Sequence, residues 1–67
     1  MLNLTVNGEP RSFEGLADVA GLVRALGLDG RKVAVERNLE IVPRSAYGRT
    51  PLAEGDRIEI VHFIGGG

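Results

Sequence analysis

One stretch of sequence decides the fold: Arg57-Ile58-Glu59-Ile60-Val61-His62-Phe63, which continues directly into Ile64-Gly65-Gly66-Gly67. Side chains with a period of two indicate a β-strand, because successive residues of a strand point to opposite faces of a sheet. Ile58 and Ile60 share one face and are the better core pair. We therefore expect a final strand whose inner face belongs to the core.

The other face of this strand carries Glu59, Val61 and Phe63. Apolar residues that stay exposed mark surfaces where other molecules bind. We predict that these three residues form a partner-docking surface. The alternative is that Phe63 only packs against Pro10 or Tyr47, and the sequence leaves this open.

The three glycines after the strand are predicted to form a flexible tail, residues 65–67, on a domain that spans residues 1–64. Small residues at a chain end are often merely frayed. Here they follow the strand without a polar linker, and three extended residues reach about 10 Å. We predict that Gly65 and Gly66 thread into a partner's active site and that the Gly67 carboxylate is the working group.

The first half of the chain predicts a hairpin followed by a helix. Strands 2–6 and 9–13 flank Asn7-Gly8, the strongest short hairpin signal. Pro10 fits an edge strand, since it cannot donate to a neighbour. A helix is expected over residues 19–26, capped by Asp18 and stopped by Gly27, with apolar residues at three- and four-residue spacing.

The second half predicts strands over residues 32–37 and 40–42, then a segment, 44–51, that is irregular or a single helical turn. A turn at residues 54–56 leads into the final strand. Strands clustered around one short helix indicate an α+β fold. We expect a mixed sheet of four to five strands packed on the helix, with the last strand central beside the first: the β-grasp (ubiquitin-like) architecture.

Composition excludes several function classes. The net charge of −1 gives no basic field for nucleic acid, and the 67 residues include no cysteine for disulfides or thiolate metal sites. No stretch resembles a membrane span or a secretory signal, so a cytoplasmic protein is expected. His62 is the only histidine, and no carboxylate has the spacing of a second metal ligand, which favours a structural role and no metal site.

The same inventory argues against an enzyme. Neither a Cys-His pair nor a recognisable serine triad is present. Four arginines could form a basic patch for an acidic partner, or simply a solvated face: Arg37, Arg44, Arg49 and Arg57.

Three stretches of the chain resemble the ThiS-like sulfur carrier proteins of thiamin biosynthesis. They are Val6-Asn7-Gly8-Glu9-Pro10, the middle segments 33–38 and 41–44, and the final segment from Glu54 to Gly67. Together they cover nearly the whole chain. Residues 47–51 contribute nothing to the resemblance.

The resemblance implies that Gly67 is adenylated with ATP by an E1-like adenylating enzyme (ThiF-like) and then converted to a thiocarboxylate. A cysteine desulfurase or sulfurtransferase would supply the sulfur, and a thiazole synthase (ThiG-like) would receive it. It implies a protein cosubstrate that binds no cofactor itself and is a monomer when free. The chemistry is sensible, because adenylation gives a poorly electrophilic carboxylate a leaving group, and glycines avoid clashes in a narrow channel.

Two alternatives use the same carboxylate. The chain could deliver sulfur for molybdopterin synthesis or tRNA thiolation, which the tail does not exclude. It could also be a ubiquitin-like modifier joined to lysines, or an interaction domain that uses only its outer face.

Overall fold

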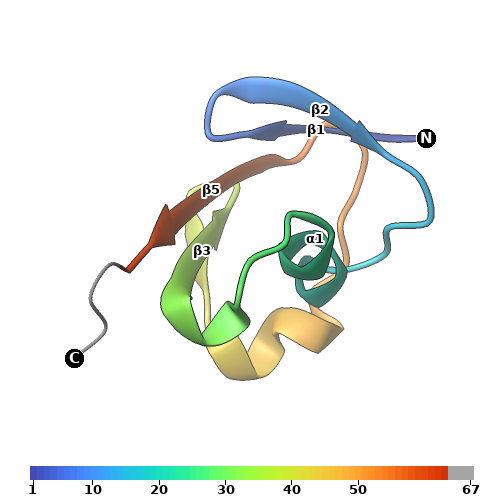
Figure 1. Ribbon diagram of the computed structural model, residues 1–67. Helices are drawn as coiled ribbons and strands as arrows, with labels where there is room; N and C mark the ends of the chain where they lie inside the picture. The colour runs from blue at the N-terminus through green and yellow to red at the C-terminus, as the bar shows by residue number, and fades with distance from the viewer. Residues whose placement is uncertain (64–67) are drawn as a thin grey trace.

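A mixed five-stranded sheet with one α-helix across one face forms the part of the chain that the computed structural model describes, residues 1–63 (Figure 1). Two short 3-10 helices, Gly30–Lys32 and Arg44–Arg49, complete the fold. The main elements are β1 (Leu2–Val6), β2 (Glu9–Phe13), α1 (Val19–Ala25), β3 (Val33–Arg37), β4 (Glu40–Val42) and β5 (Arg57–His62). The predicted tail, 65–67, and its boundary at Ile64 lie outside the described residues.

The strand order is β2-β1-β5-β3-β4, so β5 is the central strand. β5 runs parallel to β1, with Val6 opposite Ile58, and antiparallel to β3, with Val35 opposite Ile60. The two hairpins, β1-β2 and β3-β4, are antiparallel and form the flanks. The predicted β-grasp fold is confirmed, including the central place of the last strand and the edge position of Pro10.

The core lies between the sheet and α1. Ile58, Val19 and Leu22 are fully buried, and Ile60 is partly buried beside them. The helix contributes Val19, Leu22 and Val23 from one face, as their three- and four-residue spacing predicts. A helix of seven residues is too short to persist alone, so this packing is what stabilises it.

The ends of α1 follow their predicted caps. The Asp18 carboxylate accepts a hydrogen bond of 2.8 Å from the Gly21 amide, which satisfies one free donor of the first turn. The helix ends at Ala25, one residue earlier than predicted, and Gly27 follows with φ +74°. This left-handed conformation costs glycine little, so Gly27 stops the helix as expected.

Tyr47 joins the core although the sequence analysis gave it no such role. It lies in the 3-10 helix Arg44–Arg49, within a polar stretch, and is buried. Its hydroxyl donates to the Val33 carbonyl at 3.2 Å, so the polar end of the ring is satisfied. Burial raises the pKa of Tyr47. A single aromatic residue has no period, which is why the pattern did not reveal it.

Asp56 is buried at the turn into β5 and connects that turn to the β3-β4 hairpin. Its carboxylate accepts from Arg37 Nε (2.8 Å), the Ala53 amide (2.8 Å) and Asn38 Nδ2 (3.0 Å). Burial alone raises the pKa of Asp56, but the hydrogen bonds from Asn38, Ala53 and Arg37 together outweigh it and lower the pKa below 3.8.

Both hairpin turns begin with an asparagine in the left-handed region, Asn7 at φ 51° and Asn38 at φ 52°. Gly8 follows Asn7 at φ 82°, whereas Leu39 follows Asn38 at φ 72°. Two consecutive positive φ values define a type I′ turn, which asparagine and glycine favour. Leu39 therefore adopts a backbone conformation that is unfavourable for its side chain.

Replacing Leu39 with glycine should stabilise the protein by about 0.5–1 kcal/mol, because relief of the left-handed strain outweighs the extra freedom of the unfolded chain. The side chain is 78% exposed, so little packing is lost. Urea denaturation measures the change. Ile41→Gly is the control: this exposed residue lies in β4, where glycine should destabilise. A less stable Leu39→Gly variant would contradict the argument.

Replacing Asp56 with alanine should lower the free energy of unfolding by about 3 kcal/mol, since Arg37 and Asn38 lose a buried, charged acceptor. The folded-state pKa lies below the unfolded value of 3.8. The stability difference from wild type should therefore be complete above pH 3.8 and shrink as the pH falls through the lower folded-state pKa. Denaturation at several pH values tests this. Asp29→Ala, which removes an exposed ion pair with Arg31, should cost less.

Candidate functional site

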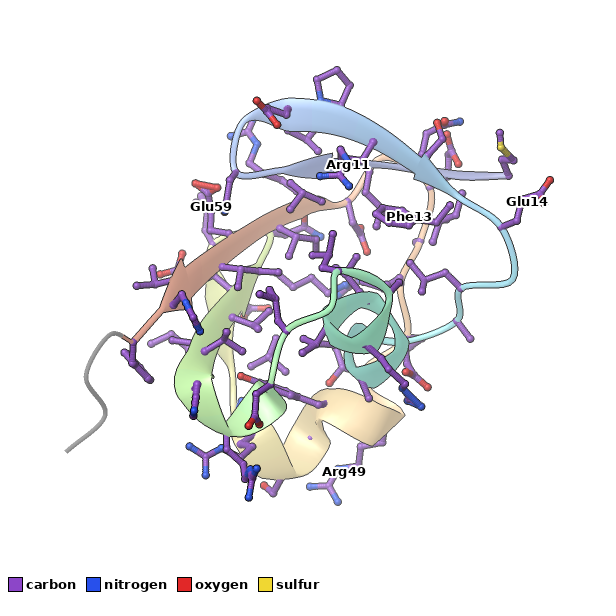
Figure 2. The ribbon with its side chains drawn as sticks, in the orientation of Figure 1. Arg11, Phe13, Glu14, Arg49 and Glu59 are labelled. Carbon is purple, nitrogen blue, oxygen red and sulfur yellow. The ribbon has the colours of Figure 1, made fainter. Side chains whose placement is uncertain are left out.

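The outer face of β5, away from α1, carries the residues predicted to dock a partner. Val61 is 60% exposed and Phe63 is 48% exposed, whereas Ile58 on the opposite face is fully buried. Glu59 is exposed as well, and Figure 2 shows it beside β5. The predicted division of the strand into two faces is therefore correct, while docking itself stays a prediction.

The alternative packing of Phe63 is not favoured by these positions. Tyr47 is buried in the core, and Pro10 is exposed on β2, which β1 separates from β5. Phe63 lies directly after β5, where its amide donates to the Lys32 carbonyl at 2.7 Å. Its backbone is anchored and about half of its side chain faces solvent.

Neighbouring strands extend this surface in a way that the sequence analysis missed. Ala34 of β3 lies opposite Val61 of β5, and Ile41 of β4 lies opposite Glu36 of β3. Ala34 is exposed and Ile41 is 77% exposed. We call Ala34, Ile41, Val61 and Phe63 the outer patch. β4 has only three residues, which are too few for alternation to show which side chains face outward. Only the pairing register with β3 identifies Ile41 as part of the outer patch.

Two carboxylates lie within this surface. Glu36 on β3 and Glu59 on β5 are directly opposite each other, and like charges at such positions repel. Within residues 1–63 the ion pairs are Asp29–Arg31 and Arg37–Asp56, so neither glutamate is neutralised by one. The apolar residues of the outer patch therefore lie beside two carboxylates, and Arg57 lies on the same face two residues from Glu59.

The four arginines considered as a basic patch do not gather in one place. The Arg37 guanidinium is bound to Asp56 on the inner side, whereas Arg57 shares the outer face with Glu59. Arg44 donates to the Arg31 carbonyl at 3.2 Å. Figure 2 shows Arg49 on its 3-10 helix, well apart from Glu59. These positions favour the alternative in which the four arginines form no common binding patch and belong to an ordinary solvated surface.

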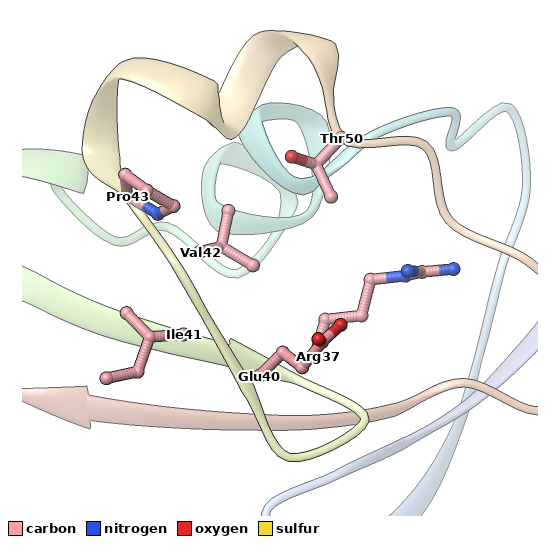
Figure 3. Close-up of a pocket in the computed structure, with 6 residues that line it drawn as sticks. All are labelled: Arg37, Glu40, Ile41, Val42, Pro43 and Thr50. Atoms are coloured by element: carbon pink, nitrogen blue, oxygen red, sulfur yellow. The ribbon is translucent and has the colours of Figure 1, made fainter.

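A small cavity beside β4 offers little room for a ligand (Figure 3). Its volume is about 150 Å³, and it is lined by Arg37, Glu40, Ile41, Val42, Pro43 and Thr50. The one guanidinium in this lining is already bound to Asp56.

Within residues 1–63, no three His, Cys, Asp or Glu side chains come together as metal ligands. No helix of this part of the chain is long and apolar enough to cross a membrane.

The sheet fixes the position of the last described residues, His62 and Phe63. On the β3 side, β5 remains paired as far as His62, opposite Val33, and then through the Phe63 amide. On the β1 side, the backbone pairing ends earlier, with Val6 opposite Ile58. The predicted threading residues Gly65 and Gly66 and the predicted reactive Gly67 lie outside the described residues. The described part of the site is thus the end of β5, beside the outer patch.

Comparisons with known proteins agree with this fold over nearly the whole chain. The family model described as the ThiS family matches residues 4–67. A sulfur carrier protein ThiS from Bacillus subtilis is 43% identical over 65 residues, which are 96% of this chain and 98% of the relative. A crystal structure of a thiamine biosynthesis protein (ThiS) from Geobacter metallireducens superposes with a TM-score of 0.83 at 39% identity, covering 98% of this chain and 100% of that one.

Longer relatives match too. A protein named thiazole synthase from Paramagnetospirillum magneticum is 54% identical over 66 residues, or 98% of this chain. A second thiazole synthase, from Magnetococcus marinus, is 48% identical over the same length. The chain spans only about a fifth of the length of each of these two proteins, since the match covers 20% of both.

Proposed function

This chain belongs to the ThiS family, and from that premise we propose that it carries sulfur on its C-terminal glycine for thiazole formation in thiamin biosynthesis. The observation that carries this proposal is the family match over residues 4–67, which includes the three terminal glycines. The Bacillus subtilis sulfur carrier, matched over 98% of its length, supports it. The comparisons do not favour carriers for molybdopterin or tRNA thiolation, or a ubiquitin-like modifier.

The proposed chemistry takes place at the Gly67 carboxylate. One of its oxygens attacks the α-phosphate of ATP on an E1-like adenylating enzyme, and pyrophosphate leaves. The outer sulfur of a cysteine persulfide on a cysteine desulfurase or sulfurtransferase then attacks the activated carbonyl, and AMP leaves, which gives an acyl disulfide. A second thiol attacks the cysteine sulfur of that disulfide, so the S–S bond breaks, the thiocarboxylate is released and an ordinary disulfide remains. The chain is a cosubstrate in this sequence, while the partners supply the catalytic groups and the ATP site.

A thiazole synthase is the proposed acceptor of the sulfur. Two proteins of that name each contain a segment similar to this whole chain. A carrier segment within a thiazole synthase supports a functional association between the two, because a covalent link keeps both at high effective concentration. We propose that this chain acts with the same kind of enzyme, in the cytoplasm where ATP is available.

The outer patch is the proposed docking surface for these enzymes. Ile41, Val61 and Phe63 offer exposed apolar area near the end of β5. Binding there would bring Gly67 close to a partner's active site and leave the core unchanged. Glu36, Glu59 and Arg57 provide polar and charged groups at its border.

Intact-mass spectrometry of the protein purified from its own cell tests the modification. Exchange of one carboxylate oxygen for sulfur adds about 16 Da, and fragmentation should place the addition on Gly67. A lysine conjugate with a protein of the cell would support the ubiquitin-like modifier and contradict the proposal.

Deletion of Gly66 and Gly67 provides the matched control. The truncated chain should keep its free energy of unfolding, because the core is formed by residues 4–58, yet gain no sulfur. Sulfur on the truncated chain would show that the reactive group lies elsewhere.

Val61→Asp and Phe63→Asp should each weaken binding to the organism's thiazole synthase about tenfold or more, because a charge replaces apolar contact area at the proposed interface. The free energy of unfolding should change by less than about 1 kcal/mol, since both residues are exposed. Titration calorimetry and urea denaturation measure the two effects. Ala25→Asp adds the same charge to the exposed end of α1 and should leave affinity unchanged. Equal loss of affinity in all three variants would contradict docking through the outer patch.

A further inference from the structure

Asn7 binds the central strand through its side chain, a contact that the turn itself does not require. Its Nδ2 group donates to the Ile60 carbonyl at 3.2 Å, and its Oδ1 atom accepts from the Ile60 amide at 2.7 Å. Both backbone groups of one β5 residue are thus bound by one side-chain amide. A carboxamide can do this because it carries a donor and an acceptor together.

These two bonds continue the ladder between β1 and β5 by one further step. The Thr5 amide donates to the Asp56 carbonyl, and the Asn7 amide donates to the Ile58 carbonyl, with a spacing of two residues on each strand. The next step would fall at Ile60, but at Asn7 and Gly8 the backbone has already turned towards β2. The side chain of Asn7 takes the place of the missing strand backbone.

The contact lies at a point on β5 where backbone pairing with β1 has already ended. Beyond Ile58, β5 has a backbone partner only on its β3 side within residues 1–63. At Ile60 the Asn7 side chain holds the β1 side of β5, and Val61, His62 and Phe63 follow. The Asn7 amide therefore restrains the strand where it leads towards the tail.

We propose that Asn7 is a positioning residue for the carrier reaction: by fixing β5 at Ile60, it sets the point from which Gly65, Gly66 and Gly67 reach the partner's active site. This inference rests on the proposed function. Asn7 touches no reacting atom, and its effect passes through β5.

Asn38 provides a natural comparison within the same chain. It also begins a hairpin turn, at φ 52° against 51° for Asn7, and its side chain also binds the strand. Its Oδ1 atom accepts from the Arg57 amide at 2.9 Å, and its Nδ2 group donates to Asp56. Asn38 therefore holds the first residue of β5, and Asn7 holds the part that leads to the tail.

The test compares Asn7→Gly with Asn38→Gly. Glycine accepts the positive φ of either turn, so each variant removes the side-chain amide and keeps the turn conformation. The carrier is titrated against the adenylating enzyme of the same organism, and ATP–pyrophosphate exchange is followed at a temperature where both variants are folded.

Asn7→Gly should lower kcat roughly tenfold with little change in the KM for the carrier, because a displaced reacting group can cost up to about a hundredfold in rate. Asn38→Gly should keep the wild-type kcat, although it also loses stability. Asn7→Asp retains an oxygen that can accept from the Ile60 amide, so its kcat should lie between those of wild type and Asn7→Gly.

Three results would overturn the proposal in distinguishable ways. A wild-type kcat for Asn7→Gly would show that the amide does not position the tail. An equal fall in kcat for both glycine variants would assign the effect to general loss of stability. Absence of exchange with the wild-type carrier would refute the proposed adenylation itself, and the positioning role with it.

Discussion

The structure depends on the pairing of its last strand, β5, from both sides. Ile58 is fully buried beneath α1, while the backbone of the strand is joined to β1 on one side and to β3 on the other. A parallel pair such as β1-β5 needs a long connection, and here that connection contains β2, α1, β3 and β4. β5 is the described strand nearest in sequence to the predicted reactive Gly67. Its pairing with β1 therefore forms only when the intervening elements are folded.

Polar side chains secure β5 where backbone pairing is incomplete. Asp56 and Asn38 hold its beginning, through hydrogen bonds that also tie down Arg37, and Asn7 holds it at Ile60. The inner face of the strand faces the core, while the outer face leaves Val61 exposed. The proposed carrier function needs this combination, since the body would have to stay folded while other enzymes act on the C-terminal glycine and bind the surface beside β5.

Much of the fold could be predicted from the sequence because its signals are local. Asn7-Gly8 forms the expected hairpin, Asp18 and Gly27 bound the helix, and the alternation from Ile58 to Val61 gives the correct faces. Tyr47 and Asp56 could not be predicted, because their burial depends on partners distant in the sequence. Ile41 joined the outer patch only through the register of β4 with β3. The resemblance to the ThiS family is confirmed.

Native-state hydrogen exchange at the Ile60 amide tests most directly whether β5 is held from both sides. This N–H donates to the side chain of Asn7 rather than to a backbone carbonyl. If that bond is an integral part of the sheet, the amide should exchange only through global unfolding, with the same free energy as the slowest core amides. Exchange with the much smaller free energy of a fraying strand end would contradict the account.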